Sequence, residues 1–212
     1  MNGYAICRGV YERIQLPRAV FHILLFKTSP AKAVIEKDIA RWIQVTRLPE
    51  LSALPKWRAL VSLLWRFQEF RNVFYYRVGK NRQILNELVL QLARLTHKPM
   101  DTLYIWTRDI GPGLFIQHGF GTIISAKSVG ENCWINQNVT IGYSNATDRP
   151  TIGDNVEVHP GAQIFGKITI GSNSKVGANA VVMKNVPANC TVVGVPAYVV
   201  RRDGIRVTES LK

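Results

Sequence analysis

His118 is the residue of this sequence best placed for chemistry, because it lies between an apolar run and two glycines in LFIQHGFGTIIS, residues 114–125. An imidazole can take a proton from an alcohol near neutral pH, which is the role of a general base. The alternative is a histidine whose ring is satisfied at a junction between two folding units. The residue pattern by itself leaves both interpretations open.

Two carboxylates, Asp109 and Asp148, could orient the His118 ring. A carboxylate on the far ring nitrogen fixes the tautomer and stabilises the imidazolium. The alternative for Asp109 is a residue at a helix terminus. Asp148 is followed by Arg149, and the alternative for this pair is two solvated, oppositely charged residues in a loop.

The charge of the chain is concentrated in its first half. Residues 1–108 carry 18 Lys and Arg against 7 Asp and Glu, whereas residues 109–212 carry 9 against 7. This asymmetry suggests that the first half faces an anionic partner. The three cysteines, Cys7, Cys133 and Cys190, lack metal-ligand spacing, which favours a reducing compartment and no metal site. With no signal peptide evident, we expect a cytoplasmic protein.

Helical periodicity dominates the first half. Apolar residues recur at helical spacing in 84–95, and the segments 31–46 and 56–78 look similar. Prolines punctuate these segments: Pro30, Pro49 and Pro55. Residues 1–108 are therefore expected to form a basic α-helical domain.

From about residue 110 the period changes to six. Nine blocks begin with Ile or Val, from VGENCW at Val129 to VMKNVP at Val182, with TDRPT at 147–151 as an insertion. Such repeats predict a solenoid of short parallel strands, in which three blocks form one triangular coil. The leading aliphatic residues and Cys133 should point inward, and Gly and Asn supply unusual backbone angles at the corners.

The frame of six also relates His118 to His159. Extended backwards, it puts Gln117 and Ile123 at block starts, so both histidines become second in their blocks. They are 41 residues apart, or 36 without the five-residue insertion, which equals two coils of 18. They should share one edge, about 10 Å apart for a strand spacing of about 4.8 Å. His159 is a second candidate for base or substrate contact, or a solvent-facing polar residue.

The blocks, the segment RDIGPGLFIQHGFGTI, the loop TIGYSNATDRPTIG and the closing VVMKNVPANCTVVGVPAYVV resemble the hexapeptide-repeat acyltransferases, closest to their serine O-acetyltransferase branch. The resemblance covers roughly residues 105–200. It implies a left-handed parallel β-helix, a homotrimer and acetyl-CoA as acyl donor. The expected fold is an α+β solenoid with a helical domain at 1–108, the β-helix at 109–200 and a tail at 201–212.

The resemblance also implies roles for individual residues. In that branch a histidine before a glycine-containing turn is the general base, which corresponds here to His118. Asp109 opens DIG where the relatives have Asp-Ile-His-Pro, but the chain is about six residues shorter from there to the histidine. Asp148 and Arg149 match the relatives' Asp-Arg-His-Pro loop. The histidine that holds serine in the relatives is missing, since the chain reads DRP.

Acetyl-CoA in the family lies in a groove between adjacent β-helices. Backbone N–H groups near Gly142 and Tyr143 are candidates to stabilise the oxyanion, and Tyr143 also to contact substrate. The positions that match the groove are Gly142, Pro160, Gly161, Ala162, Ala178 and Ala180, with Lys184 as a candidate for the phosphates. The alternative for the small residues is packing at solenoid corners.

We therefore expect an acetyl-CoA-dependent O-acetyltransferase that acts on a sugar hydroxyl in surface polysaccharide synthesis. The alternative acceptor is serine, as in cysteine biosynthesis. A metal-dependent hydratase of the γ-carbonic anhydrase kind needs three histidine ligands, partly in an H-x4-H spacing that this chain lacks. A non-catalytic scaffold is a further hypothesis.

The segment 67–82 interleaves aromatic side chains with Arg71, Arg77, Lys80 and Arg82. Basic-aromatic helices of this kind bind anionic membrane surfaces, so we expect peripheral contact with the inner face of a membrane. The alternative is that the aromatic residues pack within the helical bundle. No nucleic-acid-reading module is visible, and no nucleic-acid partner is expected.

Overall fold

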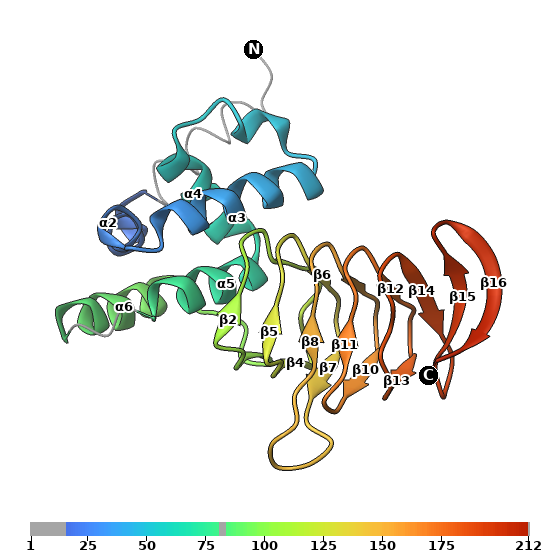
Figure 1. Cartoon of the computed structure of the whole chain (residues 1–212). Helices are drawn as coiled ribbons and strands as arrows, with labels where there is room; N and C mark the ends of the chain where they lie inside the picture. Colours follow the sequence, from blue (N-terminus) through green and yellow to red (C-terminus); the bar gives the residue numbers. More distant parts are fainter. Residues whose placement is uncertain (1–15, 81–83, 212) are drawn as a thin grey trace. The chain divides into compact units, whose positions relative to one another are not determined.

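The computed structural model describes residues 16–80 and 84–211 (Figure 1). Its contacts divide the chain into two compact units, Met1–Met100 and Asp101–Lys212. Within the described residues no helix is both long and apolar enough to cross a bilayer. Cys7 lies outside the described residues, while Cys133 and Cys190 are buried free thiols.

The first unit is helical. Its elements are α2 (Val20–Thr28), α3 (Lys32–Val45), the 3-10 helix η1 (Pro49–Leu51), α4 (Lys56–Arg66), α5 (Gln68–Val78) and α6 (Ile84–Thr96). The segment 56–78, expected to be one helical stretch, is two helices because Phe67 takes an extended conformation between α4 and α5. Arg71 stabilises this break, since Nε donates to the Leu64 carbonyl at 2.6 Å and Nη2 to the Trp65 carbonyl at 3.1 Å. These are carbonyls at the end of α4 that lack helical partners.

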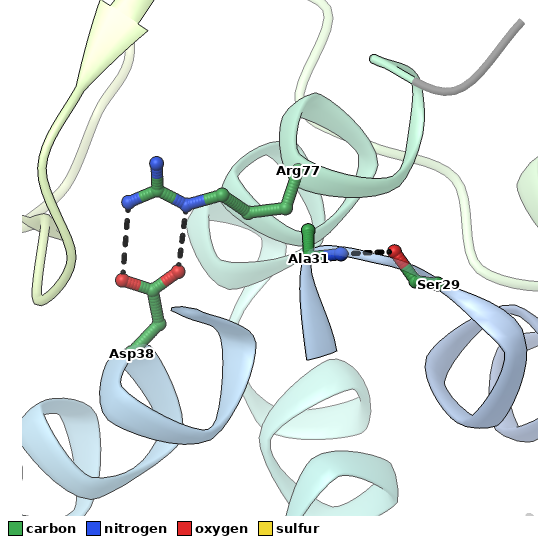
Figure 2. Close-up of polar contacts among 4 residues, drawn as sticks. All are labelled: Ser29, Ala31, Asp38 and Arg77. Atoms are coloured by element: carbon green, nitrogen blue, oxygen red, sulfur yellow. Dashed lines mark hydrogen bonds and ion pairs between the residues drawn. The ribbon is translucent and has the colours of Figure 1, made fainter. Parts of the chain in front are cut away.

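Several residues of the basic-aromatic segment contribute to the core of this unit, while contact with a membrane stays a prediction. Phe70, Phe74 and Tyr75 are nearly fully buried. Arg77 is also buried and donates from Nε and Nη2 to the Asp38 carboxylate of α3, at 2.8 and 3.2 Å (Figure 2). The alternative of packing within the bundle is thus the observed one, and Arg82 lies outside the described residues.

Figure 2 also shows how α3 begins. The Ser29 hydroxyl accepts a hydrogen bond from the Ala31 backbone N–H at 3.1 Å, just before Lys32 opens the helix. Such a side-chain acceptor satisfies one of the N–H groups left free at a helix start.

The second unit is a parallel β-solenoid with three sheets (Figure 1). The first sheet contains β1 (Leu103–Ile105), β4 (Thr122–Ile124), β7 (Thr140–Gly142), β10 (Gln163–Phe165) and β13 (Val181–Val182). The second contains β2 (Asp109–Ile110), β5 (Ser128–Val129), β8 (Thr151–Ile152) and β11 (Thr169–Ile170). The third contains β3 (Phe115–Ile116), β6 (Trp134–Ile135), β9 (Glu157–Val158), β12 (Lys175–Val176), β14 (Cys190–Val193), β15 (Tyr198–Arg202) and β16 (Ile205–Ser210).

The expected period of six holds from Val129 onward. All nine leading aliphatic residues of the blocks are buried, and Cys133 also fills the interior. At the corners between the second and third sheets, Asn155, Asn173 and Asn189 have positive φ and stack through side-chain hydrogen bonds of 3.1 and 3.0 Å. The expected fold class, a helical domain followed by a parallel β-solenoid, is confirmed, while the left hand of the coil stays a prediction.

Both ends of the solenoid differ from the expected limits of 109 and 200. Strand β1 begins at Leu103 and pairs with β4, so the solenoid starts inside the segment assigned to the helical domain. Residues 201–212 are not a simple tail, because β15 and β16 form an antiparallel hairpin that extends the third sheet beyond β14. Its turn, Asp203 and Gly204, has positive φ at both residues, which suits a tight hairpin.

Candidate active site

The corner that carries His118 departs from the repeat. Ile116 lies opposite Ile135, and Ile124 lies opposite Ile141. Ile116 and Ile124 are eight residues apart in the sequence, whereas their partners in the next coil are six apart. Ile116 and Ile124, rather than the expected Gln117 and Ile123, therefore hold the inward block-start positions. The corner contains a two-residue insertion.

His118 belongs to this insertion. After it the chain returns to the regular corner, because Asn138 N–H of the next coil donates to the Phe120 carbonyl at 2.9 Å. A Cβ on Gly121 would come within 2.5 Å of the Asn138 side-chain oxygen, so only glycine fits there. The extra residues are thus His118 and Gly119. His118 has φ 54° and an exposed side chain, and the insertion carries its ring out of the regular corner.

His159 lies on the same edge of the solenoid, which we call the histidine edge: the corners that follow β3, β6, β9 and β12. Since Val158 pairs with Ile135, and Ile135 with Ile116, His159 lies in register with Gln117. The expectation that the two histidines hold equivalent positions is therefore wrong by one residue, because of the insertion. The His159 ring is 3.6 Å from the Glu157 carboxylate, which also binds Lys175 at 2.9 Å.

Asp109 lies on a different edge. It begins β2, opposite Ser128, at a corner between the first and second sheets, whereas His118 lies between the third and first. The corners between the first and second sheets form what we call the loop edge. Within one chain the structure does not bring Asp109 to His118.

Asp148 also lies on the loop edge, in the long loop between β7 and β8 (Figure 1). Its carboxylate accepts hydrogen bonds from the backbone N–H groups of Ser144 and Asn145, both at 2.9 Å, and from the Ser144 hydroxyl. The Ser144 hydroxyl bond is the largest cause that holds the pKa of Asp148 below its usual value. Asp148 therefore closes its own loop and is not the partner of His118 within one chain.

Residues 143–147 and Arg149 of this loop are exposed. The Arg149 guanidinium lies over the Tyr143 ring, 4.9 Å from its centroid. Both side chains are accessible to a bound molecule. The structure thus brings Asp148, Arg149 and Tyr143 together in one loop, away from the histidine edge.

The predicted groove residues separate into three groups. Pro160, Gly161 and Ala178 lie on the histidine edge and are partly or fully exposed. Ala162 and Ala180 are wholly buried, and their amides and carbonyls are bonded within the backbone, so their assignment to the groove is wrong. Such a side chain in the fifth place of a block fills the interior.

The other two predicted groove residues are on the loop edge. Gly142 ends β7, and its carbonyl accepts a bond from Gly166 N–H at 3.3 Å. The Lys184 ammonium donates to the Leu211 carbonyl at 3.1 Å, which ties the C-terminal segment to the solenoid. No group of three potential metal-binding side chains is found in the part of the chain that the structure describes.

Two polar residues beside the insertion were not singled out from the sequence. Trp134 Nε1 and Gln137 Oε1, in the coil next to His118, are buried and have no hydrogen-bond partner among the described residues. The only signal in the sequence is a glutamine at a corner position next to the histidine coil.

Comparisons with known proteins agree with this fold. Residues 149–184 match the family described as bacterial transferase hexapeptide (six repeats). A serine acetyltransferase of Synechococcus elongatus is 44% identical over 102 residues, 46% of this chain and 42% of the relative. One from Staphylococcus aureus is 45% identical over 102 residues, 46% of this chain and 48% of the relative. The match therefore spans less than half the length of these curated relatives.

Solved structures give a longer match. The serine acetyltransferase of Neisseria gonorrhoeae in complex with serine is 30% identical, with a TM-score of 0.57 over 78% of this chain and 67% of that one. A serine acetyltransferase in complex with CoA is 27% identical, with a TM-score of 0.60 over 83% and 72%. The enzyme from Brucella abortus is 26% identical, with a TM-score of 0.63 over 88% and 74%.

Proposed function

The chain belongs to the hexapeptide-repeat acyltransferases, in their serine acetyltransferase-like branch, and from that premise we propose that it transfers an acetyl group from acetyl-CoA to a hydroxyl. The observation that carries the proposal is His118: an exposed imidazole in the insertion that interrupts the histidine edge. A side chain held out of a regular corner can reach a bound substrate.

His118 acts in this proposal as general base and then as general acid. It takes the proton of the acceptor hydroxyl while that oxygen bonds to the acetyl carbonyl carbon. It returns the proton to the sulfur as the carbon–sulfur bond breaks, so that CoA leaves as the thiol. The transfer is direct and uses no cysteine nucleophile, which fits the buried positions of Cys133 and Cys190.

The donor would lie along the histidine edge, against Pro160, Gly161 and Ala178. These residues follow His118 from coil to coil and present small side chains to an elongated molecule. A related serine acetyltransferase has been solved in complex with CoA. Gly142 and Lys184 are on the loop edge and could contact the same donor only from a neighbouring copy.

We propose that the protein is a homotrimer in which the loop edge of one copy faces the histidine edge of the next. This arrangement would bring Tyr143, Asp148 and Arg149 to His118, from which they are separated within one chain. An exposed aromatic pair at the start of the first sheet supports self-association, because Tyr104 in β1 and Trp106 directly after it expose 43% and 61% of their area.

Serine is the acceptor that the comparisons favour. The relatives are named serine acetyltransferases, and one was solved with serine bound. They give no support to a sugar of surface polysaccharide synthesis, the acceptor expected first from the sequence. The sugar hypothesis rested on the missing histidine of the DRP loop and on the short, basic first half, and neither observation identifies a sugar.

Release of the CoA thiol from acetyl-CoA tests the proposal, with L-serine and a panel of sugars and oligosaccharides as acceptors. Thiol release that depends on L-serine is the expected result. Release with sugars alone would overturn serine as acceptor while leaving the acetyltransferase in place. No release with any acceptor would overturn the activity.

A further inference from the structure

Gln137 has an unusual position in the solenoid. Its Oε1 is buried and has no hydrogen-bond partner among the described residues. Buried polar atoms in folded proteins nearly always have a partner, and Trp134 Nε1 of the same coil is also buried without one, so this coil has unused hydrogen-bonding capacity.

The backbone around Gln137 is fixed between two coils. Its carbonyl accepts a bond from Gly161 N–H at 3.0 Å, and the neighbouring Asn138 N–H donates to the Phe120 carbonyl at 2.9 Å. Gln137 therefore lies on the histidine edge, one coil from the insertion that carries His118. Adjacent coils are about 4.8 Å apart, so a small molecule held by one can touch the other.

Other amides near this edge are used by the fold itself. Gln163 Nε2 donates to the carbonyls of Gly161 and Asn138, at 3.2 and 3.3 Å. Asn136 Nδ2 donates to the Val158 carbonyl at 3.0 Å. Gln137 thus differs from both, because its side-chain oxygen makes no hydrogen bond with any of the described residues.

We infer that Gln137 positions the acceptor substrate: its Oε1 accepts a hydrogen bond from a donor group on the carbon next to the one that bears the reacting hydroxyl. The inference rests on the proposed function, because it assumes that His118 holds that hydroxyl. A base must lie within hydrogen-bond reach of the proton it takes. Gln137, one coil away, then meets the neighbouring substituent.

Two acceptor classes share this chemistry. A β-amino alcohol such as serine offers an ammonium group, and a sugar with adjacent hydroxyls offers a second O–H. An acceptor without the neighbouring donor would leave Oε1 unpaired, and sites that hydrogen-bond their substrate reject such analogues strongly.

Pairs of acceptors that differ only in this donor test the inference. The first pair is L-serine and 3-hydroxypropanoate, and the second is a methyl glycoside and its deoxy analogue at the hydroxyl adjacent to the acetylated one. Wild-type protein should prefer the complete acceptor by about tenfold or more in kcat/KM. Gln137→Met removes the oxygen at similar volume, and its preference should fall towards unity.

Two further variants separate positioning from general damage. Gln163→Met alters an amide that the fold uses, and it should retain the wild-type preference. Gln137→Glu keeps an acceptor oxygen, so the preference should be largely restored, which also covers the case that the methionine variant does not fold.

The outcomes are distinct. Equal loss of kcat/KM for both members of a pair in Gln137→Met, or loss of the preference in Gln163→Met, would overturn the role of Gln137 while the acetyltransferase function stands. Wild-type protein that acetylates no acceptor would overturn the proposed function, and the inference with it.

Discussion

The helical unit and the solenoid make their polar side-chain contacts in different ways. In the helical unit each buried polar contact occurs once: Arg77 with Asp38, exposed by only 3% and 1%, and His22 with the Tyr75 hydroxyl at 2.8 Å. In the solenoid, polar contacts at the exposed corners repeat from coil to coil, as in the stacked asparagines.

This difference predicts which substitutions destabilise each unit most. A single contact in the helical unit has no substitute, so its loss leaves a buried group unpaired. A repeated contact in the solenoid is one of several equivalent ones. The solenoid instead concentrates its distinctive chemistry in one irregular corner, where His118 is exposed and contributes little to packing.

The largest effect we predict separates function from stability in the solenoid. His118→Ala should lower kcat for acetyl transfer by about 10²- to 10⁴-fold, because it removes the general base. The oligomeric mass should not change and the thermal unfolding midpoint should fall only slightly, since the side chain is exposed and only the backbone at φ 54° is affected. His159→Ala serves as the matched control. A similar fall of kcat in that variant would contradict the assignment of the general base to His118.

The next effect concerns the buried ion pair of the helical unit. Asp38→Ala should lower the free energy of unfolding by about 3–5 kcal/mol, because it leaves the Arg77 guanidinium buried without its carboxylate. Urea denaturation monitored by helical circular dichroism measures this. Glu50→Ala, at an exposed pair 4.0 Å from Arg66, should cost about 0–1 kcal/mol. Equal costs for the two variants would contradict the contrast between single buried contacts and surface ones.

Acid should destabilise the helical unit before the solenoid. Burial is the main cause that lowers the pKa of His22 to about 3 and of His97 to about 4. Below about pH 6.5 these histidines bind protons in the unfolded chain but not in the folded unit. The free energy of unfolding therefore falls as the pH drops from about 6.5 towards 4. The slope is on the order of 1 kcal/mol per pH unit for each histidine.

Unfolding measured between pH 7 and pH 4 tests this dependence. His22→Phe should flatten it, whereas His159→Gln, in the exposed pair with Glu157, should leave it as in the wild type. A pH dependence that persists in His22→Phe and is seen in the β-strand signal of circular dichroism would show that the acid-sensitive groups lie in the solenoid.

The smallest effect tests the repeated corners. Asn173→Ala removes two side-chain hydrogen bonds and places alanine at φ 61°, which should cost about 1–2 kcal/mol. Asn173→Gly loses the same bonds without the backbone strain and should cost less. Calorimetric unfolding compares the two; a larger loss in the glycine variant would contradict a backbone-strain cost for alanine at this position.

Sequence periodicity predicted the regular part of the molecule well. Each block repeats the same inward aliphatic residue, so the inward positions from Val129 to Val182 follow from the residue pattern alone. The frame fails before that, because the insertion at His118 is followed by a short interval of five residues from Ile124 to Val129. Because the longer interval and the shorter interval nearly cancel, counting residues in the sequence does not reveal either of them.

Contacts that occur at only one place in the fold could not be predicted from the sequence either. The break at Phe67 depends on bonds from Arg71 to carbonyls of the preceding helix. Asp148 was a candidate partner for His118, yet its acceptor capacity is used by Ser144 and Asn145, close by in the same loop. The type of a residue shows what it can bind, while its neighbours in space decide what it does bind.

The hairpin of β15 and β16 covers the edge of the last parallel strand of the third sheet, β14. β15 runs against β14 and occupies its outer edge, so a further parallel coil, or the start of another molecule, cannot pair directly with β14. Solenoids that lack such a terminus expose a template on which copies can stack into fibres. Here residues of the same chain cover that template at β14 in the third sheet.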